Sequence, residues 1–564
     1  MNTSWMENPY NRLCAVSAKL PAGDSYLEGS TSGTLIDAKN GHVITHASLL
    51  YPFTEKFRPE NFKELLSSGY VNQSLVSNLL KIDVYLPNSS HGDGEISVND
   101  KLIHPVEVLS QNAQEISSHV KYSAKLKSVF VCKKLKDTLH KMTPKESWKI
   151  TEDLSISSSA EEVLADKRLN TKKEEMCYQL LSCFVVLKLK EFHSIESTMS
   201  TLSFKSSVDN RSGDTVEICA TPFGTMSPDV FLNSVSRGII SKLAGPQNVL
   251  IFTDARCVPG SEGGGLFYCH RGKRFLTGIV IASLCWKANE WVGLSMACSI
   301  NEVLGSLSSH FIHDIDLNKK LDSTYLPGYE NGFISRMVDN VVYVTVGASW
   351  GSGIIINKSH GVILTCSHVL KGVDYRGVCV SNAMTREELQ CSVLFRSPLK
   401  SHFDIALIKT TNLQDFHNEM TDLTFGQVTE GEVVYVIGHA IFRGNDSQSP
   451  MITRGIVSKI VKYKGVPVLL QTTCAVHAGA SGGGVFNTRG ELVAMVVCNS
   501  RDTLSGASYP HVNMCVPIET VSSIFKQYLK THDSSILSSL HVKSEGVSRL
   551  WSIGTEDSMA CSKL

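Results

Sequence analysis

Three residue types that together can hydrolyse an amide bond lie far apart in the C-terminal half of this 564-residue sequence. Ser481 sits in the small-residue segment GASGGG, His368 follows the apolar run GVILTCS, and Asp404 precedes the apolar run IALIK. A serine hydroxyl is a weak nucleophile until a base takes its proton, and a histidine oriented by a carboxylate is a suitable base. The order His, Asp, Ser along the chain therefore indicates a serine-dependent amide hydrolase that needs no cofactor and no metal.

The glycines around Ser481 predict how the negative charge of the reaction is stabilised. Glycine lacks a side chain and adopts backbone angles that other residues resist, so a substrate backbone can approach this turn closely. In such a turn the amides of Gly479 and Ser481 can point at one spot, where the oxyanion of a tetrahedral intermediate would form. We therefore expect these two amides to form an oxyanion hole.

The segments that must position these residues are predicted to be short strands. Residues 518–530 differ from them, because they carry apolar side chains at helical spacing and predict a closing helix. Short strands at regular spacing, separated by turn residues, are typical of an all-β barrel architecture. The predicted strands are 341–346, 353–356, 362–366, 433–436, 455–461, 466–471, 492–497 and 514–516.

The segments TCSHV, FDIALIK and GASGGGVF resemble the three catalytic blocks of trypsin/chymotrypsin-like serine proteases. They are more similar to those of bacterial and organellar members than to those of the secreted digestive enzymes. The resemblance extends over about residues 341–525. It implies two six-stranded antiparallel β-barrels, with the side chains of His368, Asp404 and Ser481 in the cleft between them.

The same resemblance implies the position of the substrate pocket. Ala475 would lie at its base, and Cys498 and Asn499 would line one wall. No acidic residue occurs at these positions, so we expect cleavage after a small uncharged residue, cysteine among the candidates, and not after Lys or Arg. Ala480 stands where the secreted members carry an acid that pairs with a newly cut N-terminus, so no such zymogen step is needed.

The N-terminal half contains an imperfect copy of these blocks. Residues 33–50 align without a gap with residues 353–370, and residues 259–267 align with residues 478–486. A repeat of this kind is the signature of a duplicated structural unit. We therefore expect the trypsin-like double barrel to be present twice.

The N-terminal copy lacks the catalytic residues. Ser48 stands in the position of His368, and Glu262 stands in the position of Ser481. Ser261 lies one residue early, so its side chain would leave the turn in another direction. We expect this half to have no activity of its own and to serve as a folding partner or a docking surface.

The chain is expected to divide into four segments, one of which carries an insertion. The insertion is rich in Ser and Lys and is expected to be a partly disordered surface segment. It contains Cys132, which makes it a candidate site of self-cleavage. The segments are a degenerate trypsin-like domain at 1–310 with the insertion at about 94–176, a linker at 311–332, the catalytic domain at 333–530 and a tail at 531–564.

The amino-acid composition limits the classes of binding partner that the chain is expected to have. The formal net charge is zero, so nucleic acid and anionic membrane are not indicated as main partners. No apolar run approaches the length of a membrane span, and the N-terminus lacks the pattern of a secretory signal. The sixteen cysteines are scattered without CxxC pairs, so we expect free thiols in a reducing compartment.

Ser562, Lys563 and Leu564 form the tripeptide SKL, which at a C-terminus is the address of the peroxisome. The address requires an exposed, flexible tail. Together with the protease blocks it resembles the proteases that process leader peptides inside peroxisomes. This resemblance implies matrix enzymes as substrates, the peroxisomal import receptor as a partner, cleavage after cysteine, and self-association.

Two other functions remain open on the sequence. The first is a general quality-control protease that degrades damaged matrix proteins. The second is a non-enzymatic scaffold that holds peptides with its barrel modules. Retention of all three candidate catalytic residues in one half speaks against the scaffold.

Overall fold

The computed structural model of the protein describes most of the chain. The described residues are 9–22, 25–53, 70–72, 80–88, 119–142, 148–150, 178–192, 202–282, 285–287, 290–307, 332–373, 377–381, 388–398, 401, 403–410, 423–442, 449–502, 508–551 and 559–563. Among the described residues, no helix is both long enough and apolar enough to cross a membrane. The expected linker lies almost wholly outside the described residues, and α8 (Gly332–Asp339) leads into the C-terminal half.

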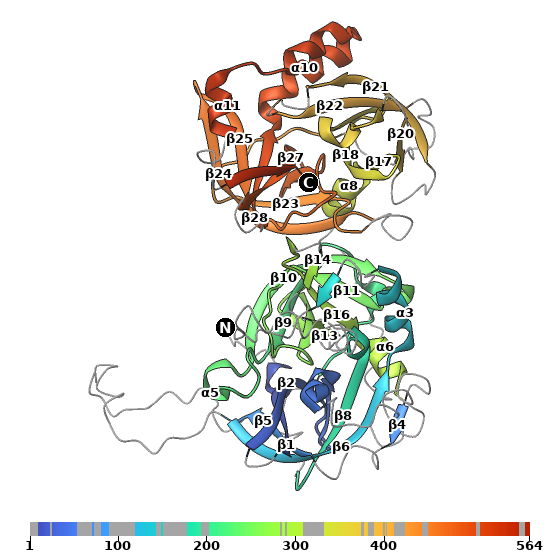
Figure 1. The fold of residues 1–564 in the computed structure, drawn as a ribbon, viewed down its shortest axis with the longest axis vertical. Coiled ribbons are helices and arrows are strands. Elements are labelled where there is room, and N and C mark those ends of the chain that lie inside the picture. Colours follow the sequence, from blue (N-terminus) through green and yellow to red (C-terminus); the bar gives the residue numbers. More distant parts are fainter. Residues whose placement is uncertain are drawn as a thin grey trace, which may run out of the picture.

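The C-terminal half consists of two closed, six-stranded antiparallel barrels (Figure 1). The first barrel has the strand order β17-β18-β19-β22-β21-β20, and the second has the order β26-β23-β24-β25-β28-β27 and closes through pairing of β26 with β27. The strands are β17 (Val341–Val346), β18 (Ser349–Asn357), β19 (Val362–Cys366), β20 (Val378–Ser381), β21 (Leu389–Arg396), β22 (Ile405–Thr410), β23 (Val433–Gly438), β24 (Met451–Tyr463), β25 (Val466–Thr472), β26 (Gly484–Asn487), β27 (Leu492–Asp502) and β28 (Ser508–Pro517).

The N-terminal half repeats this architecture, which confirms the expected duplication of the fold. Its first barrel closes through β6-β5-β1-β2-β3-β8, with β4 (Tyr70–Asn72) added at an edge, and its second barrel has the order β10-β11-β16-β13-β12-β9. The strands are β1 (Leu13–Ala22), β2 (Ser25–Asp37), β3 (His42–His46), β5 (Lys81–Pro87), β6 (His119–Val131), β8 (Cys183–Leu189), β9 (Thr215–Ala220), β10 (Ser234–Ala244), β11 (Leu250–Thr253), β12 (Gly265–His270), β13 (Lys273–Ala282) and β16 (Ser295–Ser299).

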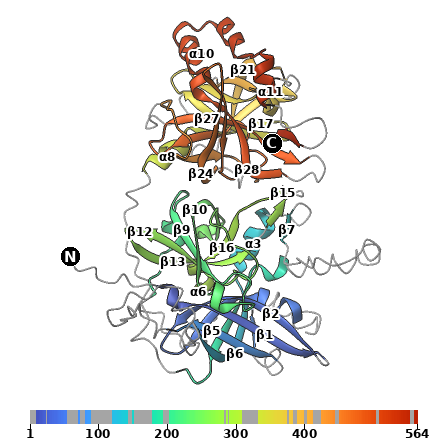
Figure 2. The same cartoon turned by 90° about the vertical axis from the view of Figure 1, so that its left-hand side faces the viewer.

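The eight strands expected in the C-terminal half are all present, since each lies within one of the strands above. Many of their buried side chains are β-branched or aliphatic, which are the types enriched in strands. The closing helix is α10 (Ile518–Thr531), and it buries Ile518, Val521 and Phe525 against the core of the catalytic half. Figure 2 shows α10 at the end of that half that faces away from the N-terminal half.

The segment expected as a surface insertion at 94–176 also contains part of the fold. Residues His119–Val131 form β6, which pairs with both β5 and β8, and α3 (Lys133–Met142) follows directly. Lysines of β6 alternate with inward apolar side chains, and its last four residues are buried. A strand whose outward face is charged has the same composition as a solvated loop, which explains the difference.

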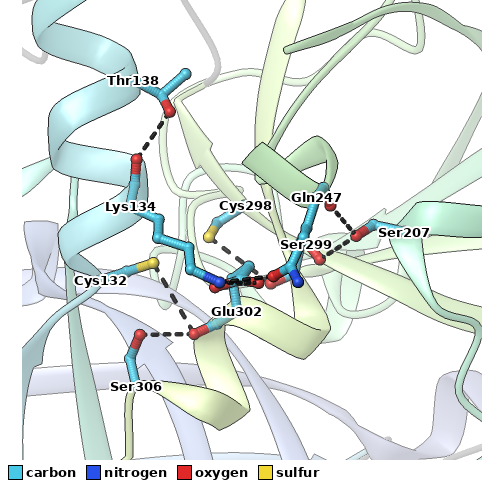
Figure 3. Close-up of polar contacts among 9 residues, drawn as sticks. All are labelled: Cys132, Lys134, Thr138, Ser207, Gln247, Cys298, Ser299, Glu302 and Ser306. Carbon is cyan, nitrogen blue, oxygen red and sulfur yellow. Dashed lines mark hydrogen bonds and ion pairs between the residues drawn. The ribbon is translucent and has the colours of Figure 1, made fainter. Parts of the chain in front are cut away.

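Helix α3 is fixed to the second barrel of its half by polar contacts (Figure 3). Lys134 Nζ lies 3.0 Å from Glu302 Oε1 and 2.6 Å from Gln247 Oε1. The thiol of Cys132, at the start of α3, points at the carbonyl oxygen of Glu302 at 3.9 Å. Cys132 is fully buried, so it does not lie in an exposed loop as expected, and self-cleavage within the insertion stays a prediction.

The two halves join through their second barrels, where β10 lies beside β24. The carboxylate of Asp254 accepts hydrogen bonds from the amide of Ile239 at 2.7 Å and from that of Arg454 at 2.8 Å, so it connects the halves. Phe252 packs against Phe442 with ring centroids 5.1 Å apart. These two rings belong to one hydrophobic core that contains residues of both halves, so the halves share part of their stabilising interior.

The segment expected as a C-terminal tail from residue 531 forms helices and a strand in its described part. A 3₁₀-helix at Ser534–Leu540 and α11 (Glu545–Trp551) pack on the catalytic half. Trp551 is buried, its ring lies 6.0 Å from that of Phe403, and its Nε1 donates to the carbonyl of Val468 at 2.9 Å. Beyond α11, β29 (Met559–Lys563) pairs with β27.

Candidate functional site

His368 and Asp404 are held together at the edge of the first barrel. His368 lies in a short 3₁₀-helix that follows β19, and Asp404 directly precedes β22, the strand that pairs with β19. His368 Nδ1 lies 2.6 Å from Asp404 Oδ2, and the amide of His368 donates to Asp404 Oδ1 at 3.0 Å. Both carboxylate oxygens are therefore used to fix the position and orientation of one imidazole.

The backbone of Asp404 is strained. Its φ of 44° lies in the left-handed region, which costs a residue with a Cβ about 1–2 kcal/mol. Its side chain is fully buried, and its carbonyl oxygen accepts the amide of Ser367 at 2.9 Å. The neighbouring Phe403 is packed against Trp551. The surrounding contacts thus hold the carboxylate in a conformation that the isolated chain disfavours.

Ser481 lies in the tight turn before β26, as the sequence predicted. Gly479 and Gly482 have φ values of 92° and 84°, which explains the need for glycine at both positions. A Cβ on Gly482 would lie 2.1 Å from the carbonyl oxygen of Ser352, so a side chain is also excluded by space. Ser481 is fully buried, and its Oγ donates to the carbonyl oxygen of Val497 on β27 at 2.9 Å.

Ser352 on β18, a residue that the sequence analysis missed, fixes this turn. Its Oγ donates to the carbonyl of Gly479 at 2.8 Å and accepts the amide of His439 at 2.8 Å. Its own amide donates to the carbonyl of Ser481 at 2.8 Å. One buried serine therefore holds both ends of the candidate oxyanion turn.

Contacts between the barrels bring the turn next to the histidine. The thiol of Cys366, two residues before His368, and the amide of Gly482 both donate to the carbonyl of Val496, at 3.3 Å and 2.9 Å. A Cβ on Gly351 would lie 2.6 Å from the side chain of Val369 and 3.2 Å from the carbonyl oxygen of Ser481. The side chains of Cys366 and Val369, on either side of His368, thus meet the carbonyl of Val496 and Gly351, which the Ser481 turn also meets.

The residues expected to form the substrate pocket also come together. Asn499 is buried and its Nδ2 donates to the carbonyl of Val476 at 2.7 Å, which joins β27 to the segment that contains Ala475. The carbonyl of Ala475 accepts the hydroxyl of Thr453 at 2.8 Å. Ala475 and Asn499 are uncharged and buried, so the residues expected around the pocket place no charge there.

The expectation of free thiols throughout is wrong at Cys498, which is disulfide-bonded. A disulfide requires two cysteines with Cα atoms about 4.4–6.8 Å apart, and this proximity cannot be read from scattered sequence positions. Twelve other cysteines, among the side chains that the structure describes, are free thiols. Most of them are buried, and burial raises the pKa of Cys183, Cys257, Cys391 and Cys474 to about 12.

The targeting tripeptide is not free in this structure. Ser562 and Lys563 belong to β29 and pair with Asn499 and Cys498 of β27, whereas Leu564 lies outside the described residues. The expectation of a free, flexible tail does not hold for these two residues, because their backbone belongs to a paired strand. The sequence could not show this, because strand pairing at a sheet edge depends on backbone groups more than on side-chain type.

The N-terminal half keeps the architecture of the turn. Ser32, the counterpart of Ser352, donates its Oγ to the carbonyl of Gly260 at 2.8 Å and accepts the amide of Thr221 at 2.7 Å. Gly260 and Gly263 have φ values of 92° and 85°, nearly those of their counterparts in the catalytic half. The residues that would do chemistry differ, since Glu262 stands for Ser481 and Ser48 for His368.

Glu262, at the position of Ser481, fills the space where an oxyanion would bind. Its Oε2 accepts the amide of Gly260 at 2.8 Å, and Gly260 is the counterpart of Gly479. His46 is buried, its ring contacts Ser48 Oγ at 3.0 Å and the carbonyl of Leu181 at 3.3 Å, and burial lowers its pKa to about 4. No described contact joins His46 to the Glu262 turn in the manner of a catalytic pair.

Comparison with known proteins agrees with this geometry. A model of the trypsin-like peptidase domain matches residues 351–495. The chain is 36% identical over 343 residues to the peroxisomal leader peptide-processing protease of Mus musculus and 35% identical over 343 residues to that of Homo sapiens. Each match covers 59% of this chain. The chain spans 58% and 59% of the length of these two curated relatives.

More distant similarity is confined to about a third of the chain. A probable periplasmic DegP-like serine endoprotease of Buchnera aphidicola is 27% identical over 185 residues, which is 32% of this chain and 36% of that protein. Among solved structures, the HtrA-type protease AlgW with a tripeptide is 20% identical, with a TM-score of 0.30. That match covers 36% of this chain and 64% of the AlgW chain.

Proposed function

Because the C-terminal half contains a trypsin-like serine peptidase domain, we propose that the protein is a peroxisomal serine endopeptidase that removes N-terminal leader peptides from imported matrix enzymes. The observation that carries the chemistry is the contact between His368 and Asp404 beside the Ser481 turn. The names of the mouse and human relatives support the substrate class and the compartment. The SKL tripeptide supports the compartment independently and adds the peroxisomal import receptor as a partner.

The imidazole of His368 acts as the general base. Asp404 holds Nδ1, so Nε2 is the ring atom that takes the proton of the Ser481 hydroxyl during attack on the substrate carbonyl. The Ser481 hydroxyl donates to the carbonyl of Val497 in the structure, and it passes its proton to the imidazole during the attack. Asp404 stabilises the imidazolium that results, and the imidazolium then protonates the leaving amine.

The amides of Gly479 and Ser481 stabilise the tetrahedral intermediate. Removing one such donor typically costs about 2.7–4 kcal/mol of transition-state stabilisation. The bonds from Ser352 to the carbonyls of Gly479 and Ser481 fix the two peptide units that flank the turn. Donors that are held in place need no reorganisation when the charge develops, so the same contacts favour catalysis.

The pocket favours a small, uncharged residue before the cut, with cysteine among the candidates. No acid lies at Ala475 or Asn499 to pair with a basic side chain, and the Asn499 amide is used to hold Val476. Incubation of the enzyme with a peptide library, followed by mass spectrometry of the products, tests this preference. Preferred cleavage after Lys or Arg would contradict it.

Two measurements test the proposed function. Ser481→Ala should abolish cleavage of every peptide that the unmodified chain cuts while leaving the fold intact, because it removes one hydroxyl group from a turn that backbone hydrogen bonds hold. N-terminal sequencing of products from peroxisomal matrix proteins should show single defined cuts near their N-termini. Progressive degradation of unfolded proteins would instead favour a quality-control protease, and peptide binding without cleavage would favour a scaffold.

The self-association implied by the resemblance is tested by light scattering of the purified protein.

A further inference from the structure

One edge of β27 runs directly past the candidate nucleophile. Along this edge, Met495 pairs with Gly484 of β26, and Val496 exchanges backbone hydrogen bonds of 2.9 Å with the glycines that follow Ser481. The carbonyl of Val497 then accepts the Ser481 hydroxyl. The next residue along the same strand, Cys498, pairs with Lys563 of β29. The edge beyond the nucleophile is therefore occupied by a segment from the end of this chain.

The pairing of β29 with β27 is antiparallel and has a regular register. Cys498, Asn499, Ser500, Arg501 and Asp502 lie opposite Lys563, Ser562, Cys561, Ala560 and Met559. Because the strands are antiparallel, the chain of β29 advances toward Val497 and hence toward Ser481. Figure 1 shows the C-terminal end of the chain next to β27. The other edge of β27 is paired with β28, so a second peptide cannot add there.

An extended peptide binds to proteins of many folds by adding a strand to an exposed sheet edge. Main-chain hydrogen bonds then supply affinity, and adjacent pockets supply specificity. Here the paired stretch of β27 includes Asn499, whose side chain is bonded to the segment of the expected pocket. A polypeptide that placed a residue in that pocket and a carbonyl at Ser481 would need the edge that β29 occupies. Ser481 is also fully buried in this conformation, so the nucleophile is closed to an incoming polypeptide.

We propose that residues 559–563 occupy, within the same molecule, the strand-pairing site that an extended peptide substrate uses, so that the tail and the substrate exclude each other. The identity of the competing peptide rests on the proposed function. The docking of residues 559–563 on β27 does not depend on the proposed function. The occupant is this chain's own segment, and the release of that segment opens the site and frees the backbone of Ser562 and Lys563 at the same time.

The tether makes this competition effective. Trp551 is anchored in the catalytic half, and only residues 552–558 connect it to β29. A short connection keeps the segment at an effective concentration of the order of millimolar. If the open form were about a tenth of the population, the apparent affinity for a peptide would be lowered about tenfold. The maximal rate would be unchanged, because saturating substrate displaces the tail.

The first experiment compares the full chain with a variant that ends at Gly554. A peptide selected from the library is the probe, and kcat and KM are measured with and without a thiol reductant because Cys498 is disulfide-bonded. We expect KM to fall about tenfold on removal of residues 555–564, with kcat unchanged. A synthetic peptide of residues 559–564, added in trans, should raise the KM of the shortened chain and not lower its kcat. An unchanged KM under both redox conditions would overturn the proposal.

Two double variants of the full chain provide a matched pair. Hydrogen-bonded and non-hydrogen-bonded positions alternate in antiparallel pairs, so amides of opposite parity in β29 face opposite sides. Ala560→Pro with Ser562→Pro removes one set of amides, and Met559→Pro with Lys563→Pro removes the other, and neither changes Cys561. We expect KM to fall only in the double variant that removes the amides of β29 that donate to β27. If both double variants kept the KM of the unmodified full chain, the docking would be contradicted.

Hydrogen exchange tests the docking without any catalysis. Ser481→Ala is introduced into both the full chain and the chain that ends at Gly554, and exchange of the amides from Cys498 to Asp502 is followed by mass spectrometry. Faster exchange in the shortened chain would support docking of the tail even if no peptide is ever cleaved, and the proposed function alone would then be wrong. Equal exchange in the two chains would overturn the docking, whatever the activity.

Discussion

Asp404 binds His368 through two different atoms, since one carboxylate oxygen contacts the ring nitrogen at 2.6 Å and the other accepts the backbone amide at 3.0 Å. The second bond fixes the start of the helical turn that carries the imidazole, and the first fixes the rotation of the ring. The position of the proposed general base therefore depends on the buried carboxylate of Asp404.

Replacing Asp404 by Asn separates these two contributions. The amide oxygen of Asn can still accept the backbone amide of His368, but its NH₂ group favours the wrong tautomer of the ring. We expect kcat to fall about 10⁴-fold, as in other enzymes with this triad, with KM little changed. The measurement is steady-state kinetics, with circular dichroism as the control for folding. A loss of less than about tenfold would contradict the role of Asp404 as the orienting acid.

Ser352→Ala tests the support of the candidate oxyanion turn, and Ser32→Ala is its matched control. Each substitution leaves a buried carbonyl and a buried amide without the hydroxyl that they contact, which costs about 1–3 kcal/mol. Only the first acts on the turn of Ser481, where a misplacement of about 1 Å can lower the rate about 10²-fold. We expect similar losses of stability in urea unfolding and a loss of kcat in Ser352→Ala alone. Equal kinetic effects of the two substitutions would contradict this assignment.

Trp551 is expected to stabilise the catalytic half although it lies beyond the closing helix. Trp551→Phe removes the hydrogen bond to Val468 and leaves a buried carbonyl, at a cost of about 1–3 kcal/mol. Trp551→Ala also removes the ring that contacts Phe403, and we expect a total of about 3–5 kcal/mol. Thermal unfolding of both variants distinguishes the two contributions. Removal of residues 552–564 should leave the melting temperature much closer to that of the full chain than Trp551→Ala does.

Asp254 gives the contact between the halves a pH dependence. Burial raises the pKa of its carboxyl to about 6, above the value of about 3.9 for an exposed aspartate. The folded chain therefore holds this proton more tightly than the unfolded chain, and its stability contribution is lost as the pH rises through 6. Asp254→Asn cannot ionise, so its stability relative to the native chain should improve from pH 4.5 to pH 7. If the difference in free energy of unfolding between Asp254→Asn and the native chain were the same at each pH, this prediction would be wrong.

Restoring a serine to the N-terminal half should not restore activity. Glu262→Ser, made in a Ser481→Ala background, places a hydroxyl at the turn, but Ser48 stands where the general base is needed. His46 is bonded to Ser48 and to the carbonyl of Leu181, so it is not available to replace that base. We expect no cleavage of the library peptides. Measurable cleavage would show that the half retains a base that the described contacts do not reveal.

The sequence singled out three candidate catalytic residues because a His, an Asp and a Ser follow one another in that order, each next to an apolar run or a glycine-rich turn. Strands of the catalytic half were predictable for a different reason, since β-branched runs between glycines leave few other arrangements. Ser352 was missed because a lone serine in a strand has no distinctive chemistry. The repeat contained the missing signal, since Ser32 and Ser352 lie directly before the two aligned segments.

Other features depended on proximity in space and were not predictable. The disulfide at Cys498 and the pairing of β29 with β27 each require two distant segments to meet. The strand β6 was hidden by its lysines, which face outward while its other face is buried. Amino-acid composition averages the two faces of a strand. A strand with one charged face and a solvated loop can therefore have the same composition.

The hydrogen bond from the amide of Gly260 to the carboxylate of Glu262 has a consequence for peptide binding. A degenerate half that had lost its nucleophile but kept a vacant donor turn would capture carbonyl groups without ever releasing a product. Such a turn would compete with the proposed active site for peptide substrates. Because Glu262 already accepts the amide of this turn, the N-terminal half would take no part in that competition.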